Sequence, residues 1–282
     1  MGRFATSWEL VKESFAVLQK DKEIMLFPLL SAVVTVLLFM SFLLPLFFGS
    51  FAGDTFFYGI LFVYYLFSYF IVIFFNTGLI ACARIRLDGG DPTFKDGWCA
   101  AVKHIGPIFG WALVSATVGL LLRMLADKAR DNFITQIIIS LLGIAWTFLT
   151  FFVIPVLIFE HVGVFEAIKR SGSLFKKTWG ENVIVQFSLG GVFLVLGLLG
   201  ALPLVLAFAL GASLTVWLIL LSVCILYWTL LGIVSASLNG IFIAALYHYA
   251  LKGEVPRAFT AEHVKQAFTG KSRTITDGFV GN

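Results

Sequence analysis

Six long apolar segments alternate with short polar segments along the 282 residues of the chain. A helix needs about 20 mostly apolar residues to cross the hydrocarbon core of a bilayer. None of the six segments contains Lys, Arg, Asp or Glu, and none shows the alternating pattern of a barrel strand. We therefore predict six transmembrane helices, since only helices and closed barrels satisfy their backbone in lipid. The predicted spans are 24–48, 56–83, 105–122, 133–159, 183–210 and 214–246.

The polar segments between these spans are too short to fold separately. We expect an all-α, polytopic membrane protein with a single domain over residues 1–268 and a polar C-terminal tail over 269–282. The fifth and sixth spans are separated only by residues 211–213. A turn is required there, because the combined apolar length would cross the bilayer twice.

Basic residues collect on one side of this predicted topology. Seventeen of the 20 Lys and Arg residues fall in the N-terminal, second, fourth and C-terminal polar segments, and only Arg123, Lys128 and Arg130 fall on the other side. Basic residues near span ends stay in the cytoplasm. The sequence therefore predicts a multi-pass protein of the inner (plasma) membrane with both termini cytoplasmic.

Each long cytoplasmic segment carries a helix-start pattern followed by an amphipathic stretch. The starts pair Thr6 with Glu9, Thr93 with Asp96, and Gly163 with Glu166, a spacing at which an acid can tie up free backbone donors. Such stretches are typical of helices lying in the membrane interface. We expect anionic lipid head groups to contact the basic residues of the third stretch, namely Lys169, Arg170, Lys176 and Lys177.

The order of segments suggests three repeats of one unit, an interfacial helix followed by a transmembrane hairpin. Residues 76–81 (Asn-Thr-Gly-Leu-Ile-Ala) resemble residues 239–244 (Asn-Gly-Ile-Phe-Ile-Ala), near the ends of the second and sixth spans. The middle unit lacks this Asn and carries Pro155. Two readings stay open here: internal duplication, and the similarity of composition that any apolar hairpins share.

Composition supports a membrane protein and narrows its chemistry. Hydrophobic residues make up 60% of the chain and charged residues 13%, about half the charged share of a soluble domain. The net charge of +4 is too small to indicate nucleic-acid binding. We expect Cys82, Cys99 and Cys224 to be free, because no pair has the close spacing of a zinc or redox motif.

Residues 155–171 (Pro-Val-Leu-Ile-Phe-Glu-His-Val-Gly-Val-Phe-Glu-Ala-Ile-Lys-Arg-Ser) are the most distinctive stretch of the chain. They resemble a pattern shared by families of uncharacterised bacterial and archaeal six-helix membrane proteins. These families include relatives of the membrane domain fused to some glycerophosphodiester phosphodiesterases. The opening at residues 7–28 resembles one such family of unknown function more closely. This resemblance implies the six-helix fold and brings no catalytic residues, and the phosphodiesterase domain itself is absent from the sequence.

Few residues are candidates for chemistry. The sequence has no nucleotide-binding glycine pattern, no nucleophile elbow and no cluster among its four histidines, so we expect no enzymatic activity, no cofactor and no metal. Asn76 and Asn239 lie inside spans, where an amide either bonds to a neighbouring helix or lines a polar pathway. Glu160 ends the fourth span, where it forms either an ion pair or a site at the mouth of a cavity.

Two functions fit these expectations. The first is a non-enzymatic membrane scaffold or assembly subunit that binds another membrane protein, favoured by the uniformly apolar, Phe-rich spans. The alternative is a carrier or channel for a small solute or lipid, favoured by the repeats, since repeat interfaces often hold binding sites.

Overall fold

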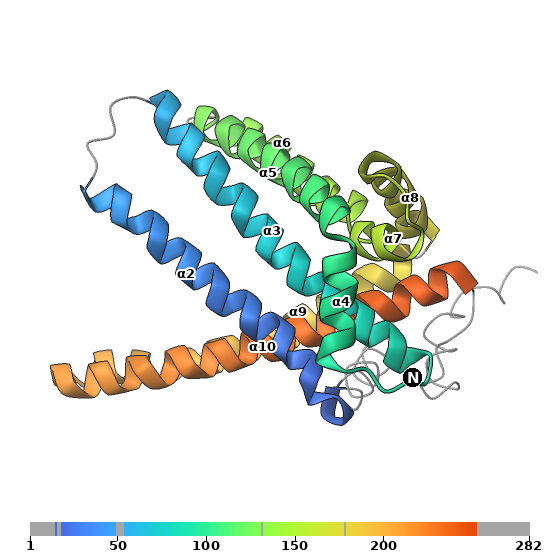
Figure 1. The fold of residues 1–282 in the computed structure, drawn as a ribbon. Coiled ribbons are helices and arrows are strands. Elements are labelled where there is room, and N and C mark those ends of the chain that lie inside the picture. The colour runs from blue at the N-terminus through green and yellow to red at the C-terminus, as the bar shows by residue number, and fades with distance from the viewer. Residues whose placement is uncertain (1–14, 16–17, 49–53, 131, 178, 253–282) are drawn as a thin grey trace, which may run out of the picture.

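The computed structural model describes residues 15, 18–48, 54–130, 132–177 and 179–252 (Figure 1). Of these residues 89% are helical and none lies in a strand, so the predicted all-α class is confirmed. The elements in chain order are η1 (Lys22–Met25), α2 (Leu26–Phe48), α3 (Asp54–Leu87), α4 (Phe94–Lys103), α5 (Ile105–Lys128), α6 (Phe133–Leu149), α7 (Val153–Phe159), α8 (Val164–Lys177), α9 (Trp179–Ala209) and α10 (Leu214–Lys252).

Within the part of the chain that the structure describes, six helical segments are long and apolar enough to cross a membrane, as predicted. Several helices extend beyond the predicted spans: α3 continues to Leu87, α5 to Lys128 and α10 to Lys252. The predicted spans are shorter because hydropathy identifies only the apolar part of each helix. Polar residues at the ends continue the same backbone hydrogen bonding in water or against protein partners.

The fourth span has the predicted bounds, Phe133–Phe159, but a turn divides it into two helices where the sequence predicted one. Residues 150–152 form a turn between α6 and α7. Pro155 accounts for the position of the break, because proline lacks an N–H and its ring clashes with the carbonyl four residues earlier. Because Phe152 lies in the turn, its N–H has no helical carbonyl to bond, and it donates to Ser171 Oγ of α8 at 2.9 Å. Phe152 and Ser171 are both 0% exposed, so this bond lies wholly inside the protein.

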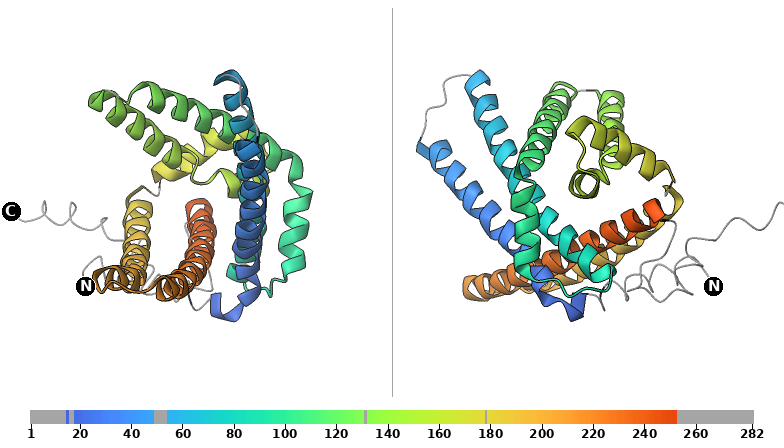
Figure 2. Two further views of the ribbon diagram at one scale, coloured as in Figure 1. Left: turned by 90° about the vertical axis from the view of Figure 1, so that its left-hand side faces the viewer. Right: turned by 45° about the vertical axis from the view of Figure 1, so that its right-hand side comes forward.

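The spans form three hairpins, α2–α3, α5 with α6–α7, and α9–α10. The views of Figures 1 and 2 show these hairpins pointing in different directions from a common region. We call this region the hub and define it by buried side chains of α3, α7 and α10. Its members include Ile80, Ala83, Leu87, Val153, Val156, Leu157, Ile241, Ala244, Leu246 and Tyr247.

Helix α3 is the central element of the hub, packing against α2, α4, α5, α7 and α10. It approaches α4 closely because glycines face each other at Gly78 and Gly97. A Cβ added at Gly97 would lie 2.6 Å from the Gly78 carbonyl oxygen and 2.7 Å from Cys82 Sγ, and would also meet the ring of Phe27. The two glycines therefore let α4 lie directly on α3, with Phe27 closing the contact.

The parts of the hairpins that lie outside the hub keep large apolar side chains exposed. Leu37, Leu141, Leu198 and Leu226 are all more than half exposed. In water such surface would be unfavourable, whereas a bilayer solvates it. The fold thus has a packed hub and apolar arms, as expected of a multi-pass membrane protein.

Candidate functional site

Polar side chains meet at the edge of the hub, where α7 and α10 end and α8 begins. The hydroxyl of Tyr247 donates to Glu160 Oε1 at 3.0 Å. The other carboxylate oxygen of Glu160 lies 3.1 Å from Nε of Arg170 on α8. Tyr247 is 0% exposed, so its hydroxyl requires an internal acceptor. We call Glu160, Arg170 and Tyr247 the Glu160 junction.

An arginine of α3 joins this junction through aromatic rings. The guanidinium carbon of Arg84 lies 5.1 Å from the centre of the Phe159 ring, within reach of a cation–π interaction. Phe159 in turn stacks on Tyr247, with ring centres 5.7 Å apart. Arg84 also pairs with Asp88 at 2.8 Å. The ends of the second, fourth and sixth spans are therefore linked by one set of contacts.

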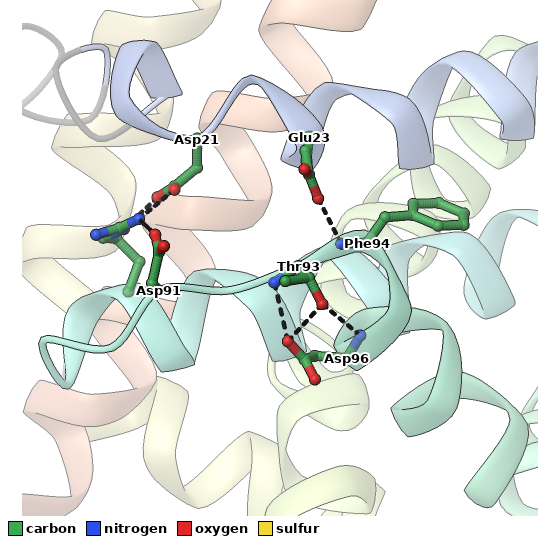
Figure 3. Close-up of polar contacts among 7 residues, drawn as sticks. Asp21, Glu23, Asp91, Thr93, Phe94 and Asp96 are labelled. Carbon is green, nitrogen blue, oxygen red and sulfur yellow. Dashed lines mark hydrogen bonds and ion pairs between the residues drawn. The ribbon is translucent and has the colours of Figure 1, made fainter.

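A second cluster ties the segment before α2 to the end of α3 (Figure 3). Arg86 donates from two nitrogens to both carboxylate oxygens of Asp21, and from Nη2 also to Asp91. Asp21 is buried and Asp91 is exposed. A bidentate pair fixes direction as well as distance. The cluster therefore sets the position at which the chain enters its first span.

Helix α4 begins at the capping box that the sequence predicts. The Thr93 hydroxyl accepts from the backbone N–H of Asp96, and the Asp96 carboxylate accepts from the Thr93 backbone N–H at 2.9 Å. The Thr93 hydroxyl also donates to the Asp96 carboxylate at 2.7 Å. The hydrogen bonds that this carboxylate accepts from the hydroxyl and from the N–H of Thr93 hold the pKa of Asp96 below its usual range. Glu23 adds an acceptor for the N–H of Phe94 at 2.7 Å (Figure 3). Glu23 thus satisfies one of the free donors of a helix that begins 71 residues later.

The other two predicted helix starts are at Gly163 with Glu166 and at Thr6 with Glu9. Helix α8 begins at Val164, directly after Gly163, and Gly163 accepts the first hydrogen bond from Ala167. The start proposed at Thr6 and Glu9 lies outside the described residues.

The two faces of α8 differ in character. Ala167, Leu174 and Phe175 are buried, and the helix packs against α6 and α7. Phe165 is 79% exposed on the outer side, where Lys169 and Lys176 are also exposed. The apolar side of α8 is thus occupied by the protein itself.

A comparison with protein-family models finds a match over residues 55–257, to a group described as a family of unknown function, DUF6159. The chain belongs to the DUF6159 family. The match runs from the start of α3 to beyond α10, so it includes the Glu160 junction and excludes Asp21. No curated protein matches the chain.

In this DUF6159 member the predicted polar residues of the spans occupy different environments. Asn76 is half-buried on α3, whereas Asn239 is exposed on α10. The glycines that follow them are buried, and a Cβ added at Gly240 would overlap the side chain of Leu79. Helices α3 and α10 can therefore approach closely because residue 240 has no side chain.

The other residues that the sequence predicted as candidates are the charged residues of α8 and Glu160 before it. Glu160 forms an ion pair with Arg170, which is one of the two alternatives predicted for it. Lys169, Lys176 and Lys177 are exposed on α8 of the DUF6159 fold.

The sequence prediction missed Tyr247, Arg84 and the Asp21–Arg86 pair. Tyr247 lies at the end of a uniformly apolar run, where a tyrosine is easily taken as one more hydrophobic residue. Arg84 and Arg86 entered the prediction only as charges that set orientation. Polar residues in the last turn of a span were the available signal, because buried polar atoms need partners.

Proposed function

We propose that the protein is a non-enzymatic membrane scaffold or assembly subunit whose apolar arms bind other membrane proteins. The observation that carries this proposal is the Glu160 junction. Glu160 is the acid that the sequence identified as a candidate substrate or proton site. Its carboxylate is engaged by both Arg170 and Tyr247 and serves to join α7, α8 and α10.

The α9–α10 hairpin supports a role in binding partners. It packs on the rest of the protein mainly through the C-terminal part of α10, which contacts α3. Along α9, an added Cβ at Gly190, Gly191 or Gly197 would meet nothing within 4 Å. Small residues on open helix faces let another transmembrane helix approach closely. This hairpin is therefore the arm that we expect to carry a membrane-protein partner.

The cavity between α2 and α3 also fits a scaffold better than a solute pathway. It has a volume of about 190 Å³ and is lined by apolar atoms. Its walls are Phe39, Phe42, Leu43, Phe57, Ile60, Leu61 and Tyr64. A pathway for a polar solute needs polar groups along its wall.

A carrier or channel for a small solute or lipid is the second candidate, and the break between α6 and α7 favours it. Discontinuous helices and repeated units line the binding sites of many transporters. The structure contains three hairpins, each preceded by a short helix (η1, α4 or α8). Against a carrier, the N–H freed at the break is bound by Ser171 inside the protein.

Cysteine accessibility in proteoliposomes separates the two functions. We would replace Asn76 and Asn239 by cysteine, one at a time, in a variant with Cys82 and Cys224 replaced by alanine. A charged methanethiosulfonate reagent reacts only with thiols that water reaches. For a scaffold, the native Cys99, which is exposed on α4, should react and position 76 should not. Reaction at both 76 and 239 would support a water-filled pathway and contradict the scaffold.

We also propose that both termini are cytoplasmic and that α8 lies against anionic head groups of the inner membrane. Two observations support this proposal. Of the 20 Lys and Arg residues, 17 lie on one side of the predicted topology and three on the other, and Lys169, Lys176 and Lys177 are exposed. A cysteine at position 176 should stay unlabelled from outside, while one near position 54 should react. Each basic residue near an anionic surface contributes about 1 kcal/mol.

The lipid contact has its own test. Melting temperatures in nanodiscs should rise with anionic lipid for the native protein and less for a Lys169→Gln, Lys176→Gln, Lys177→Gln variant. An equal rise in both would exclude the contact. The likeness to the membrane domain fused to some glycerophosphodiester phosphodiesterases stays a prediction and supplies no catalytic role.

A further inference from the structure

Two histidines from distant parts of the chain meet beside the hub. His104 lies at the bend between α4 and α5 and is 8% exposed. Its Nε2 lies 3.4 Å from Nδ1 of His161 in the turn between α7 and α8. The rings are within 8° of parallel and their centres are 5.4 Å apart, nearly the greatest separation that a 3.4 Å contact between two ring nitrogens allows. The two imidazoles therefore meet edge to edge, which is the arrangement of an N–H···N hydrogen bond.

The other nitrogen of His104 fixes which ring donates. Nδ1 of His104 lies 2.8 Å from the carbonyl oxygen of Ala100, which can only accept. Nδ1 of His104 therefore carries a proton, and in the neutral ring Nε2 is left as an acceptor. His161 must then donate from its Nδ1. A single proton between the two rings holds the contact together.

The backbone of His161 adopts an uncommon conformation. Its φ is +53°, and it is the one non-glycine residue with positive φ in the described part of the chain. A side chain in this region costs free energy, which the surrounding structure must offset. His161 is exposed, and its hydrogen bond to His104 joins its side chain to the bend between α4 and α5.

We propose that the His104–His161 pair is a proton-sensitive latch between the α4–α5 bend and the α7–α8 turn. With one or no extra proton on the pair, His161 still donates to His104. With both rings protonated, two N–H groups point at each other and two positive charges repel. Acidification therefore opens the latch and releases the strained turn at His161.

The charged groups around the pair do not replace this contact. The elements that pack there carry further charged and titratable groups. These are Arg84 and Arg86 on α3, Asp88 directly after it, Lys95, Asp96 and Lys103 on α4, Glu160 after α7, Glu166, Lys169 and Arg170 on α8, and His248, which lies beside Asp88, and Lys252 on α10. Asp88, Asp96 and Glu160 are held by Arg84, Thr93 and Arg170 respectively. Among the described residues, no carboxylate lies within 4.0 Å of either of these two rings. A second proton on the pair is thus left without a carboxylate to neutralise it.

The latch can be measured with spin labels on α4 and α8 in the full-length protein. Cys99 and a cysteine replacing the exposed Phe165 would carry the labels, with Cys82 and Cys224 replaced by alanine. Histidine charge changes occur between pH 5 and 8. We expect the distance distribution to be narrow at pH 8, and to broaden or lengthen by pH 5.

Three variants decide whether this pair is responsible. His161→Asn tolerates positive φ and does not titrate, and His104→Gln removes the acceptor ring; both should abolish the pH response. His248→Gln, at the other buried histidine, should keep it. An unchanged distance in the native protein, a response that survives in both pair variants, or its loss in His248→Gln would overturn the proposal.

A second measurement does not depend on whether these variants fold. In the native protein labelled with 15N-histidine, magnetic resonance should show a scalar coupling between the two ring nitrogens at pH 8. This coupling should be lost at pH 5. Its absence at pH 8 would refute the shared proton.

Discussion

Replacing Ser171 by alanine should destabilise the protein through a single backbone hydrogen bond. The Ser171 hydroxyl is the acceptor for the N–H of Phe152 at the break between α6 and α7. Both residues are 0% exposed, so no water can take the place of the hydroxyl. A buried donor that loses its partner costs about 1–3 kcal/mol. Since 1.4 kcal/mol is a factor of ten, the ratio of folded to unfolded protein should fall by roughly five- to 150-fold.

A matched control lies two residues along the same helix. Ser173 is exposed, and its hydroxyl bonds only to the Arg170 carbonyl in its own turn at 2.8 Å. Ser173→Ala should therefore change stability by less than about 0.5 kcal/mol. The assay is reversible unfolding of each variant in mixed micelles with increasing denaturing detergent. Equal stability of Ser171→Ala and Ser173→Ala would refute the idea that Ser171 closes the break.

Three further predictions concern packing, capping and the polar residues of the spans. Gly97→Ala should lower the melting temperature strongly, since its Cβ meets the backbone of α3, whereas Gly106→Ala, with open space at its Cβ, should not. The lowered pKa of Asp96 means that its cap stabilises the protein above the ordinary carboxyl pKa of about 3.9 and loses effect as pH falls through the lowered value. Asp96→Asn should thus be less stable than the native protein at pH 7, and the two stabilities should converge in acid; a constant difference would contradict this. Asn76→Leu and Asn239→Leu should each lower stability by about 0.5–2 kcal/mol if their amides bond between helices; unchanged melting of both variants would favour a wet pathway instead.

Hydropathy and charge predicted the number and approximate position of the spans, because both depend only on local composition. The start of α4 was also predictable, since Thr93 and Asp96 are three residues apart and act on one helix end. The break in the fourth span was harder. Pro155 marks it in the sequence, but residues 150–152 are as compatible with lipid as their neighbours.

The contacts that build the candidate site could not be predicted. Phe152 and Ser171 are 19 residues apart, and Glu160 and Tyr247 are 87 apart. Uniformly apolar spans show no distinct inner face, so periodicity does not tell which helices meet. Glycines are the partial exception, because Gly78, Gly97 and Gly240 each mark a place where another element comes close.

The hub can be completed only after α10 has been synthesised. Residues 238–247 of α10 supply a large part of its buried surface, and they leave the ribosome after α3 and α7, the helices that they cover. Until then Leu79 of α3 lacks the helix that covers it, and Glu160 lacks Tyr247. A nascent chain that ends after α9 already holds five membrane-length segments with an unfilled centre. Insertion of the early hairpins and the folding of their inner ends are thus separated in time.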